Sequence, residues 1–163
     1  GRVAEALPSI PFLTQLQLGY NTVGSEGAGN LGRALPSCPQ LKSIDLQSNM
    51  IGPEGAGTLS ACLPRCKKLS VLNLKGNIIK NEGAMKLANC LERVPWMQRL
   101  DLRGNQIKLQ PSPKPNSRSP ARSSGSRKFF GHTVQVAETP EIDGVEVATV
   151  LSKYPSIQFL EAS

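Results

Sequence analysis

The side chains best suited to chemistry in this sequence are four cysteines and a single histidine. Cys62 and Cys66 have three residues between them, no Cys-x-x-Cys pair occurs and no histidine stands near them, so their spacing does not favour zinc. The histidine, His132, lies in a Pro/Ser-rich segment that is poorly suited to orienting a nucleophile. No Gly-x-x-x-x-Gly-Lys-Ser/Thr phosphate loop is present. We therefore expect no enzyme, no metal site and no cofactor.

The sequence contains a clearer group of residues suited to binding than to catalysis. Arg99, Asp101 and Arg103 stand at alternate positions, which places all three on one side of a strand. A planar guanidinium can hold a carboxylate through two hydrogen bonds, so this group forms the strongest polar cluster of the sequence. How the chain positions it follows from an internal repeat.

Apolar residues recur at an offset of 28 residues. Each unit reads L-x-x-L-x-L-x-x-N-x-I/V-x-x-E-G-A-x-x-L-x-x-A/C-L, with identical Glu-Gly-Ala triplets at 26–28, 54–56 and 82–84. The leading columns are Leu13, Leu41, Leu69 and Met97, then Leu16, Ile44, Leu72 and Leu100, then Leu18, Leu46, Leu74 and Leu102. The cysteines fall in columns of small residues, which predicts a place in the core rather than a disulfide framework.

Each unit is predicted to be a strand, a turn and a helix. Residues 16–18 alternate apolar, polar and apolar, as a strand with one buried side does. Residues 31–35 and their equivalents have the i, i+3, i+4 spacing of one helical face, and Pro36 and Pro64 follow where the helix should stop. The glycine of each Glu-Gly-Ala triplet is predicted to allow a tight helix entry, where a Cβ would crowd the neighbouring turn.

One asparagine recurs in every unit, directly after the strand. We predict that its side-chain amide binds backbone groups that the turn directs away from water, and that the stacked asparagines bridge adjacent units. This structural ladder consists of Asn21, Asn49, Asn77 and Asn105.

The period, the Glu-Gly-Ala helix entry and the cysteines near the helix end resemble the ribonuclease-inhibitor-like class of leucine-rich repeats. That class occurs in ribonuclease inhibitor, the Ran GTPase-activating protein and the sensing regions of NOD-like receptors. The resemblance covers residues 3–107 well and 142–160 loosely. It implies a curved α/β leucine-rich-repeat solenoid, with parallel strands on the concave side and helices on the convex side, that acts as a noncatalytic protein-protein interaction scaffold.

Three regions are expected along the chain. Residues 1–107 hold a partial first unit, the units starting at 13, 41 and 69, and the strand of the unit at 97. Residues 108–141 are a Pro/Ser-rich basic insertion predicted to be largely disordered, and 142–163 resume with a helix and the start of a fifth strand, with Ile157 in the column of Leu13. Both ends fall inside a unit, which predicts a fragment of a longer repeat protein.

Charge is concentrated in the insertion. The chain has 19 Lys and Arg against 12 Asp and Glu, a net charge of +7. Residues 108–132 hold six basic residues and no acidic one, which leaves 13 against 12 elsewhere. The insertion is therefore compatible with nonspecific contact with nucleic acid or membrane headgroups, and its Ser-Pro residues Ser112 and Ser119 are candidate phosphorylation sites. No apolar run reaches the roughly 20 residues of a membrane helix, and no signal-peptide pattern occurs, so a cytoplasmic or nuclear location is expected.

We predict that a protein partner, of unknown identity, binds the outward side of the strands, here called the strand face. This face is densely polar and offers no aromatic platform for bases. Its rows are Gln15, Gln17 and Gly19, then Ser43, Asp45 and Gln47, then Val71, Asn73 and Lys75, then Arg99, Asp101 and Arg103, and a partial row of Phe159 and Glu161. Two alternatives are left open by the resemblance: a GTPase-activating regulator similar to the Ran GTPase-activating protein, and a sensor fragment of a NOD-like receptor.

Overall fold

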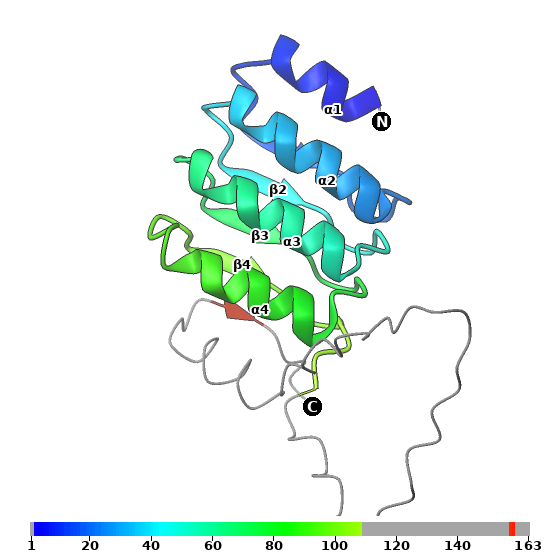
Figure 1. The fold of residues 1–163 in the computed structure, drawn as a ribbon. Helices are drawn as coiled ribbons and strands as arrows, with labels where there is room; N and C mark the ends of the chain where they lie inside the picture. Colours follow the sequence, from blue (N-terminus) through cyan, green and yellow to red (C-terminus); the bar gives the residue numbers. More distant parts are fainter. Residues whose placement is uncertain (1, 109–156, 159–163) are drawn as a thin grey trace, which may run out of the picture.

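The computed structural model describes residues 2–108 and 157–158, in which strands and helices alternate (Figure 1). The strands are β1 (Gln15–Gln17), β2 (Ser43–Asp45), β3 (Val71–Asn73), β4 (Arg99–Asp101) and β5 (Ile157–Gln158). The α-helices are α1 (Arg2–Ala6), α2 (Gly24–Ala34), α3 (Pro53–Cys62) and α4 (Lys80–Leu91). Short 3₁₀ turns follow the first three helices, at Leu7–Ser9, Leu35–Ser37 and Leu63–Arg65.

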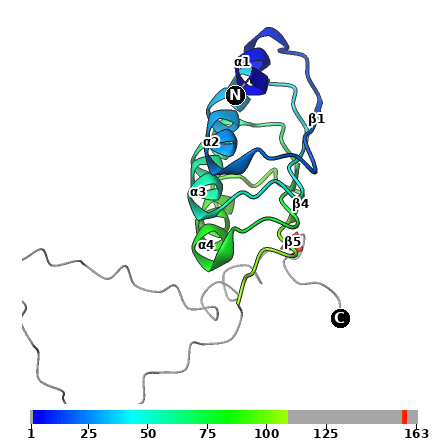
Figure 2. The same cartoon turned by 90° about the vertical axis from the view of Figure 1, so that its right-hand side faces the viewer.

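The five strands form one parallel sheet in the order β1-β2-β3-β4-β5. Leu16 pairs with Ile44, Ile44 with Leu72 and Leu72 with Leu100, so neighbouring partners are 28 residues apart. All four helices lie on the same side of the sheet, stacked in the order of the chain (Figures 1 and 2). The fold is therefore the predicted α/β repeat solenoid, with one turn of the coil for each 28-residue unit.

The core lies between the sheet and the helix layer. The inward strand residues Leu46, Leu72 and Leu74 and the helix residues Leu59 and Leu87 have no exposed surface. In each 3₁₀ turn a proline directly follows a buried leucine. The α-helix ends there because proline has no backbone N–H to donate the hydrogen bond that would continue it. The described helices have at most 12 residues, and none is long and apolar enough to cross a membrane.

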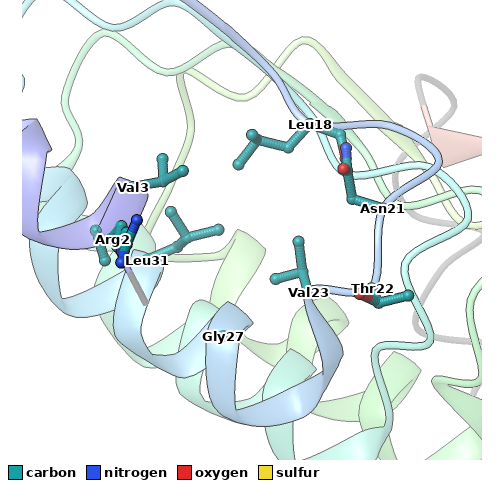
Figure 3. Close-up of a pocket in the computed structure, with 9 residues that line it drawn as sticks. Arg2, Val3, Leu18, Asn21, Thr22, Val23, Gly27 and Leu31 are labelled. Atoms are coloured by element: carbon teal, nitrogen blue, oxygen red, sulfur yellow. The ribbon is translucent and has the colours of Figure 1, made fainter.

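The core is less well covered at its β1 end. Leu16 and Leu18 are only half-buried, and no strand among the described residues lies on the outer side of β1. A cavity of about 330 Å³ opens there between α1 and the first complete unit. Leu18, Val3, Val23 and Leu31 point into it (Figure 3). In the next unit the equivalent residues Leu46, Ile51 and Leu59 are fully buried, because the preceding turn of the coil covers them.

The fifth strand pairs in a different register from the one predicted. Leu100 pairs with Ile157 and Asp101 with Gln158, whereas the repeat columns place Leu160 opposite Leu100. Both registers set an apolar residue type opposite Leu100, so the sequence pattern does not distinguish them. Backbone pairing decides between them, and it brings the chain back to the sheet three residues earlier.

The ladder asparagines link each unit to the one before it. The side-chain oxygen of Asn77 accepts hydrogen bonds from the backbone N–H groups of Asn49 and Ile51, both at 3.0 Å. Its side-chain nitrogen donates to the carbonyls of Leu46 at 3.0 Å and Leu74 at 2.8 Å. Because Asn77 is almost fully buried, water cannot replace these bonds.

The other members of the ladder show how this role depends on position. Asn105 donates to the Leu74 carbonyl of the preceding unit at 2.8 Å, and Asn49 donates to the Leu18 carbonyl at 2.8 Å. Asn21 is exposed and donates only to the carbonyls of its own turn, those of Leu18 and Gly19. Among the described residues, the asparagines that join two turns of the coil are therefore Asn49, Asn77 and Asn105, the three inner members of the ladder.

Replacing an inner ladder residue should cost far more stability than replacing the outer one. We expect Asn77→Ala to lower the free energy of unfolding by about 2–3 kcal/mol, because it leaves buried backbone groups without partners. Asn21→Ala, the matched control, should cost below about 1 kcal/mol because water can reach its partners. Thermal unfolding followed by circular dichroism measures both. Equal losses would show that the bridging bonds do not distinguish these positions.

The glycines of the Glu-Gly-Ala triplets allow adjacent units to approach closely. A Cβ on Gly55 would lie 2.8 Å from the Cα of Ser25 in the preceding unit and 2.9 Å from a methyl carbon of Ile51. A Cβ on Gly83 would lie 3.0 Å from the Cα of Pro53. Backbone atoms cannot move aside without shifting a whole turn of the coil, so these positions exclude any larger residue.

A pair of Gly→Ala variants tests this close approach. Gly55→Ala should destabilise the fold by about 1–3 kcal/mol through overpacking. Gly29→Ala, where the new Cβ would make ordinary contacts of 3.5 Å or more with Thr58, should instead stabilise helix α2 by up to about 1 kcal/mol. Denaturant unfolding of the two variants gives both values, and a stabilising Gly55→Ala would contradict the crowding argument.

Candidate functional site

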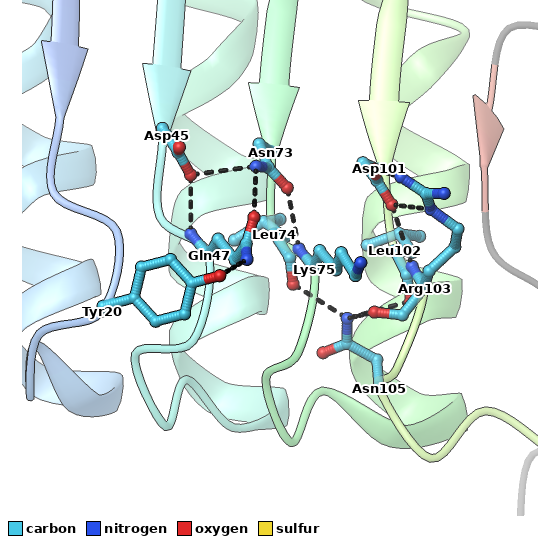
Figure 4. A network of polar contacts seen from close by, with 10 residues as sticks. All are labelled: Tyr20, Asp45, Gln47, Asn73, Leu74, Lys75, Asp101, Leu102, Arg103 and Asn105. Carbon is cyan, nitrogen blue, oxygen red and sulfur yellow. Dashed lines mark hydrogen bonds and ion pairs between the residues drawn. The ribbon is translucent and has the colours of Figure 1, made fainter. Parts of the chain in front are cut away.

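The strand face is built from side chains at the ends of β2, β3 and β4 and from the residues just beyond them (Figure 4). The 28-residue register sets Asp45, Asn73 and Asp101 side by side. Because successive strand residues point to opposite sides, these three point away from the leucines of the core. Gln15 and Gln17 are exposed on the outermost strand, β1.

The middle column of the strand face also shapes the backbone. A side-chain oxygen of Asp45 accepts the N–H of Gln47 at 2.9 Å, that of Asn73 accepts the N–H of Lys75 at 3.1 Å, and that of Asp101 accepts the N–H of Arg103 at 3.2 Å. This is the Asx-turn geometry that short Asp and Asn side chains make with the amide two residues on. These predicted binding residues therefore also end their strands.

Side-chain amides connect three successive units across the strand face. The Asn73 amide nitrogen donates to Asp45 at 3.0 Å and to the side-chain oxygen of Gln47 at 3.2 Å. The Gln47 amide nitrogen in turn donates to the Tyr20 hydroxyl. Asp45, Asn73 and Gln47 are half-buried, so their orientations are held by neighbours rather than set by solvent. We call Tyr20, Asp45, Gln47 and Asn73 the amide network.

The sequence analysis missed Tyr20. The residue is 77% exposed at one end of the amide network, and its backbone is in the left-handed region with φ of 58°. It stands in the column that holds Ser48, Gly76 and Gly104 in later units, all with positive φ, after the strand rather than on it. The available signal was a large aromatic residue in a column otherwise filled by serine and glycine.

Asp101 and Arg103 form an ion pair within the chain. The Nε of Arg103 donates to Asp101 at 2.9 Å, and a second guanidinium nitrogen contacts the other carboxylate oxygen. Asp101 is only 5% exposed. Burial by itself would raise the pKa of Asp101, but the hydrogen bonds from Arg103 and the positive charges of Arg103 and Arg99 outweigh it and hold the pKa below its ordinary value. The guanidinium of Arg103 thus makes its two contacts with a carboxylate of the same cluster, that of Asp101.

On β2, β3 and β4 and just beyond them, the structure brings predicted strand-face residues together in two groups. The first is the amide network around Asn73. The second is a basic end in which Arg99 is exposed and Lys75 and Arg103 are half-buried around Asp101. The following predicted residues lie outside the described part of the chain: Ser112, Ser119, His132, Phe159 and Glu161.

Two buried cysteines, Cys66 and Cys90, are poorly suited to nucleophilic chemistry. Burial raises the pKa of the Cys66 thiol to about 11, with smaller contributions from Cys62 and Cys38, and burial raises that of Cys90 to about 11 against the opposing charge of Arg93. Such thiols are neutral near pH 7, whereas the thiolate is the nucleophile and the metal ligand. Within residues 2–108 and 157–158, no group of three or more His, Cys, Asp or Glu side chains could hold a metal ion.

Comparison with known proteins supports the repeat architecture. A family model described as Leucine Rich repeat matches residues 9–32, 37–60 and 65–88. No curated protein sequence matches the chain. Among solved structures, one described as leiomodin-1 actin-binding site 2 is similar, with a TM-score of 0.66 and 14% sequence identity. The similarity covers 99% of this chain and 79% of that one. The chain therefore contains leucine-rich repeats and shares a fold with that structure.

The lowered pKa of Asp101 predicts how stability depends on pH. A carboxyl whose pKa is depressed on folding contributes stability above its unfolded pKa, near 3.8, and loses it as the pH falls through the folded pKa. Asp101→Asn should therefore lower the free energy of unfolding by about 1–2 kcal/mol at pH 7, and this difference from the wild type should shrink below about pH 4. Urea unfolding across this range measures it. A difference that stays constant down to pH 3 would show that the carboxylate charge is not its source.

Proposed function

We propose that this chain is a noncatalytic protein-interaction module whose strand face binds a protein partner. The observation that carries the proposal is the amide network, in which polar side chains of three successive units are fixed by one another at a solvent-accessible surface. Side chains that are already ordered lose less conformational entropy on binding. They also keep unused hydrogen-bonding capacity, since an amide oxygen can accept two bonds.

The two ends of the strand face suit different partner groups. Tyr20 offers a large exposed ring with a hydroxyl, a residue type that frequently dominates binding energy. Arg99 and Lys75 supply positive charge at the other end. Three strand spacings of about 4.8 Å separate the units of Tyr20 and Arg99. The surface therefore suits a partner that places an apolar group near Tyr20 and a carboxylate near Arg99, on a unit three strands away.

The repeat class is part of the same proposal. The 28-residue period with one helix in each complete unit supports assignment to the ribonuclease-inhibitor-like class. The name of the structural neighbour gives actin as a ligand of leiomodin-1. Actin is therefore the first purified protein to test against this chain.

Site-specific crosslinking tests which surface meets the partner. A photo-crosslinking residue at Gln17, exposed on β1, should capture the partner, whereas the same residue at Ala61, exposed on α3 on the opposite side, should not. Both variants should unfold at the wild-type temperature, since neither side chain is buried. Efficient capture from Ala61 with none from Gln17 would contradict binding on the strand face.

Affinity measurements then test the basic end. With the captured partner, Lys75→Ala combined with Arg99→Ala should weaken binding by more than about tenfold, or 1.4 kcal/mol, because two charged contacts with the partner are lost. The matched control, Lys80→Ala with Lys86→Ala on α4, removes the same charge from the helix side. Arg103 is left intact because its removal would leave the buried Asp101 carboxylate without its main partner. Surface-based binding kinetics compare the two double variants, and equal affinity of both would contradict the proposal.

A further inference from the structure

A second charged surface lies at the edge of the solenoid, on the segments that lead into β2, β3 and β4. These segments, residues 35–42, 63–70 and 91–98, contain five basic residues and a single acidic one, Glu92. All five basic side chains are exposed. We call them the basic edge: Lys42, Arg65, Lys67, Lys68 and Arg93.

The charge of the solenoid itself is higher than the sequence analysis indicated. Residues 2–108 hold thirteen basic and seven acidic residues, a net charge of +6. Outside residues 108–132 the net charge is close to zero, with 13 basic and 12 acidic residues, because five of these acidic residues follow position 132. Residues 108–132 are therefore not the only basic region, and the basic edge is where much of the excess on residues 2–108 collects.

Two lysines of the basic edge are positioned by neutral groups. The Lys67 ammonium lies 4.4 Å from the centre of the Trp96 ring, and the Lys68 ammonium donates to the side-chain oxygen of Gln40 at 2.6 Å. The indole N–H of Trp96 donates to the Cys66 carbonyl at 2.9 Å, which fixes the ring. Neither contact neutralises a lysine charge, so both cations are held in place with their charge available to an anion.

The repeat sets two of these cations, Arg65 and Arg93, at corresponding positions of neighbouring units. Equivalent backbone hydrogen bonds form each turn, from Leu41 to Cys38, from Leu69 to Cys66 and from Met97 to Val94, at 3.0–3.1 Å. Corresponding positions of neighbouring units are therefore about one strand spacing apart, near 4.8 Å. At this separation neighbouring carboxylates of one flexible segment can reach Arg65 and Arg93 together, and Lys67 and Lys68 lie on the same segment as Arg65.

We propose that the basic edge binds an acidic segment of a partner protein, one rich in Asp and Glu. Two of the five cations are arginines, whose forked guanidinium matches a carboxylate through two hydrogen bonds. A single-stranded nucleic acid is the less suitable ligand, because base stacking needs an open aromatic face and Lys67 lies over the ring of Trp96. This surface is separate from the strand face of the proposed function.

The test uses the whole chain and a labelled oligoglutamate peptide, with oligoglutamine as the uncharged control. Peptide anisotropy gives the affinity. The fluorescence of Trp96, the single tryptophan, reports the place of binding, because carboxylates that draw Lys67 away change the surroundings of the ring. We expect oligoglutamate to bind saturably, to change Trp96 fluorescence and to bind more weakly as salt is added, and we expect oligoglutamine to do none of these.

Charge-matched variants decide where the peptide binds. Lys67→Gln with Lys68→Gln should weaken oligoglutamate binding at least tenfold, and Lys67→Arg with Lys68→Arg should retain the affinity. Lys75→Ala with Arg99→Ala, on the strand face, should bind oligoglutamate as the wild type does. This strand-face variant separates the two proposals, because it should lose binding to the partner of the strand face and keep binding to oligoglutamate. Thermal unfolding confirms that each variant is folded.

Three results would overturn the proposal. Full affinity in the Lys67→Gln, Lys68→Gln variant would mean that the basic residues of 108–132 attract the peptide instead. Equal weakening by the edge and strand-face variants would mean that only net charge matters. A change in Trp96 fluorescence caused by a single-stranded oligonucleotide or by phosphatidylserine vesicles at lower concentration than by oligoglutamate would assign the basic edge to nucleic acid or to a membrane.

Discussion

The fold depends on satisfying backbone groups at the bend that follows each strand. Turning the chain from sheet to helix directs N–H and carbonyl groups inward, where water cannot reach them. In the inner units one buried asparagine supplies both the donors and the acceptor that these groups need, as Asn77 does for Asn49, Ile51 and Leu46. Each asparagine also spans two units, so the bond that completes one turn of the coil holds the next turn in register. The parallel sheet and the stacked helices follow from this repeated link.

On the strand face, residues proposed for binding also hold the local structure. Asp45, Asn73 and Asp101 each tie down the amide two residues on, and the first two also join the amide network. A polar side chain that must hold its own turn cannot also rearrange freely around a ligand. If the strand face binds a partner as proposed, residues beside this column, such as Tyr20 and Arg99, are better placed to adapt to it. Asp101 shows the limit of this arrangement, because its carboxylate is buried and already paired with Arg103.

The repeat separates the candidate surfaces in space. Outward strand residues form one face, and the segments that enter the strands form an edge. Because each unit contributes one residue per column, substitutions in one column change one surface with little effect on the other. The two surfaces also hold their charges differently. The strand face sets Asp101 among its basic residues, whereas Lys67 and Lys68 on the basic edge are held by an aromatic ring and an amide. These differences suit the two surfaces to different ligands.

The sequence by itself determined the period, the order of strand and helix in each unit and the columns that form the core, because burial at a given position in the coil recurs every 28 residues. Only the tertiary structure decided which groups pair. Arg103 binds Asp101, Tyr20 reaches Gln47 of the next unit and Lys67 lies over Trp96, and each pairing depends on distances between side chains that periodicity does not specify. The tertiary structure also decided the register of β5, which differs by three residues from the predicted one. Ile157 and Leu160 are both apolar and fit the same column, so only backbone hydrogen bonding distinguishes the two registers.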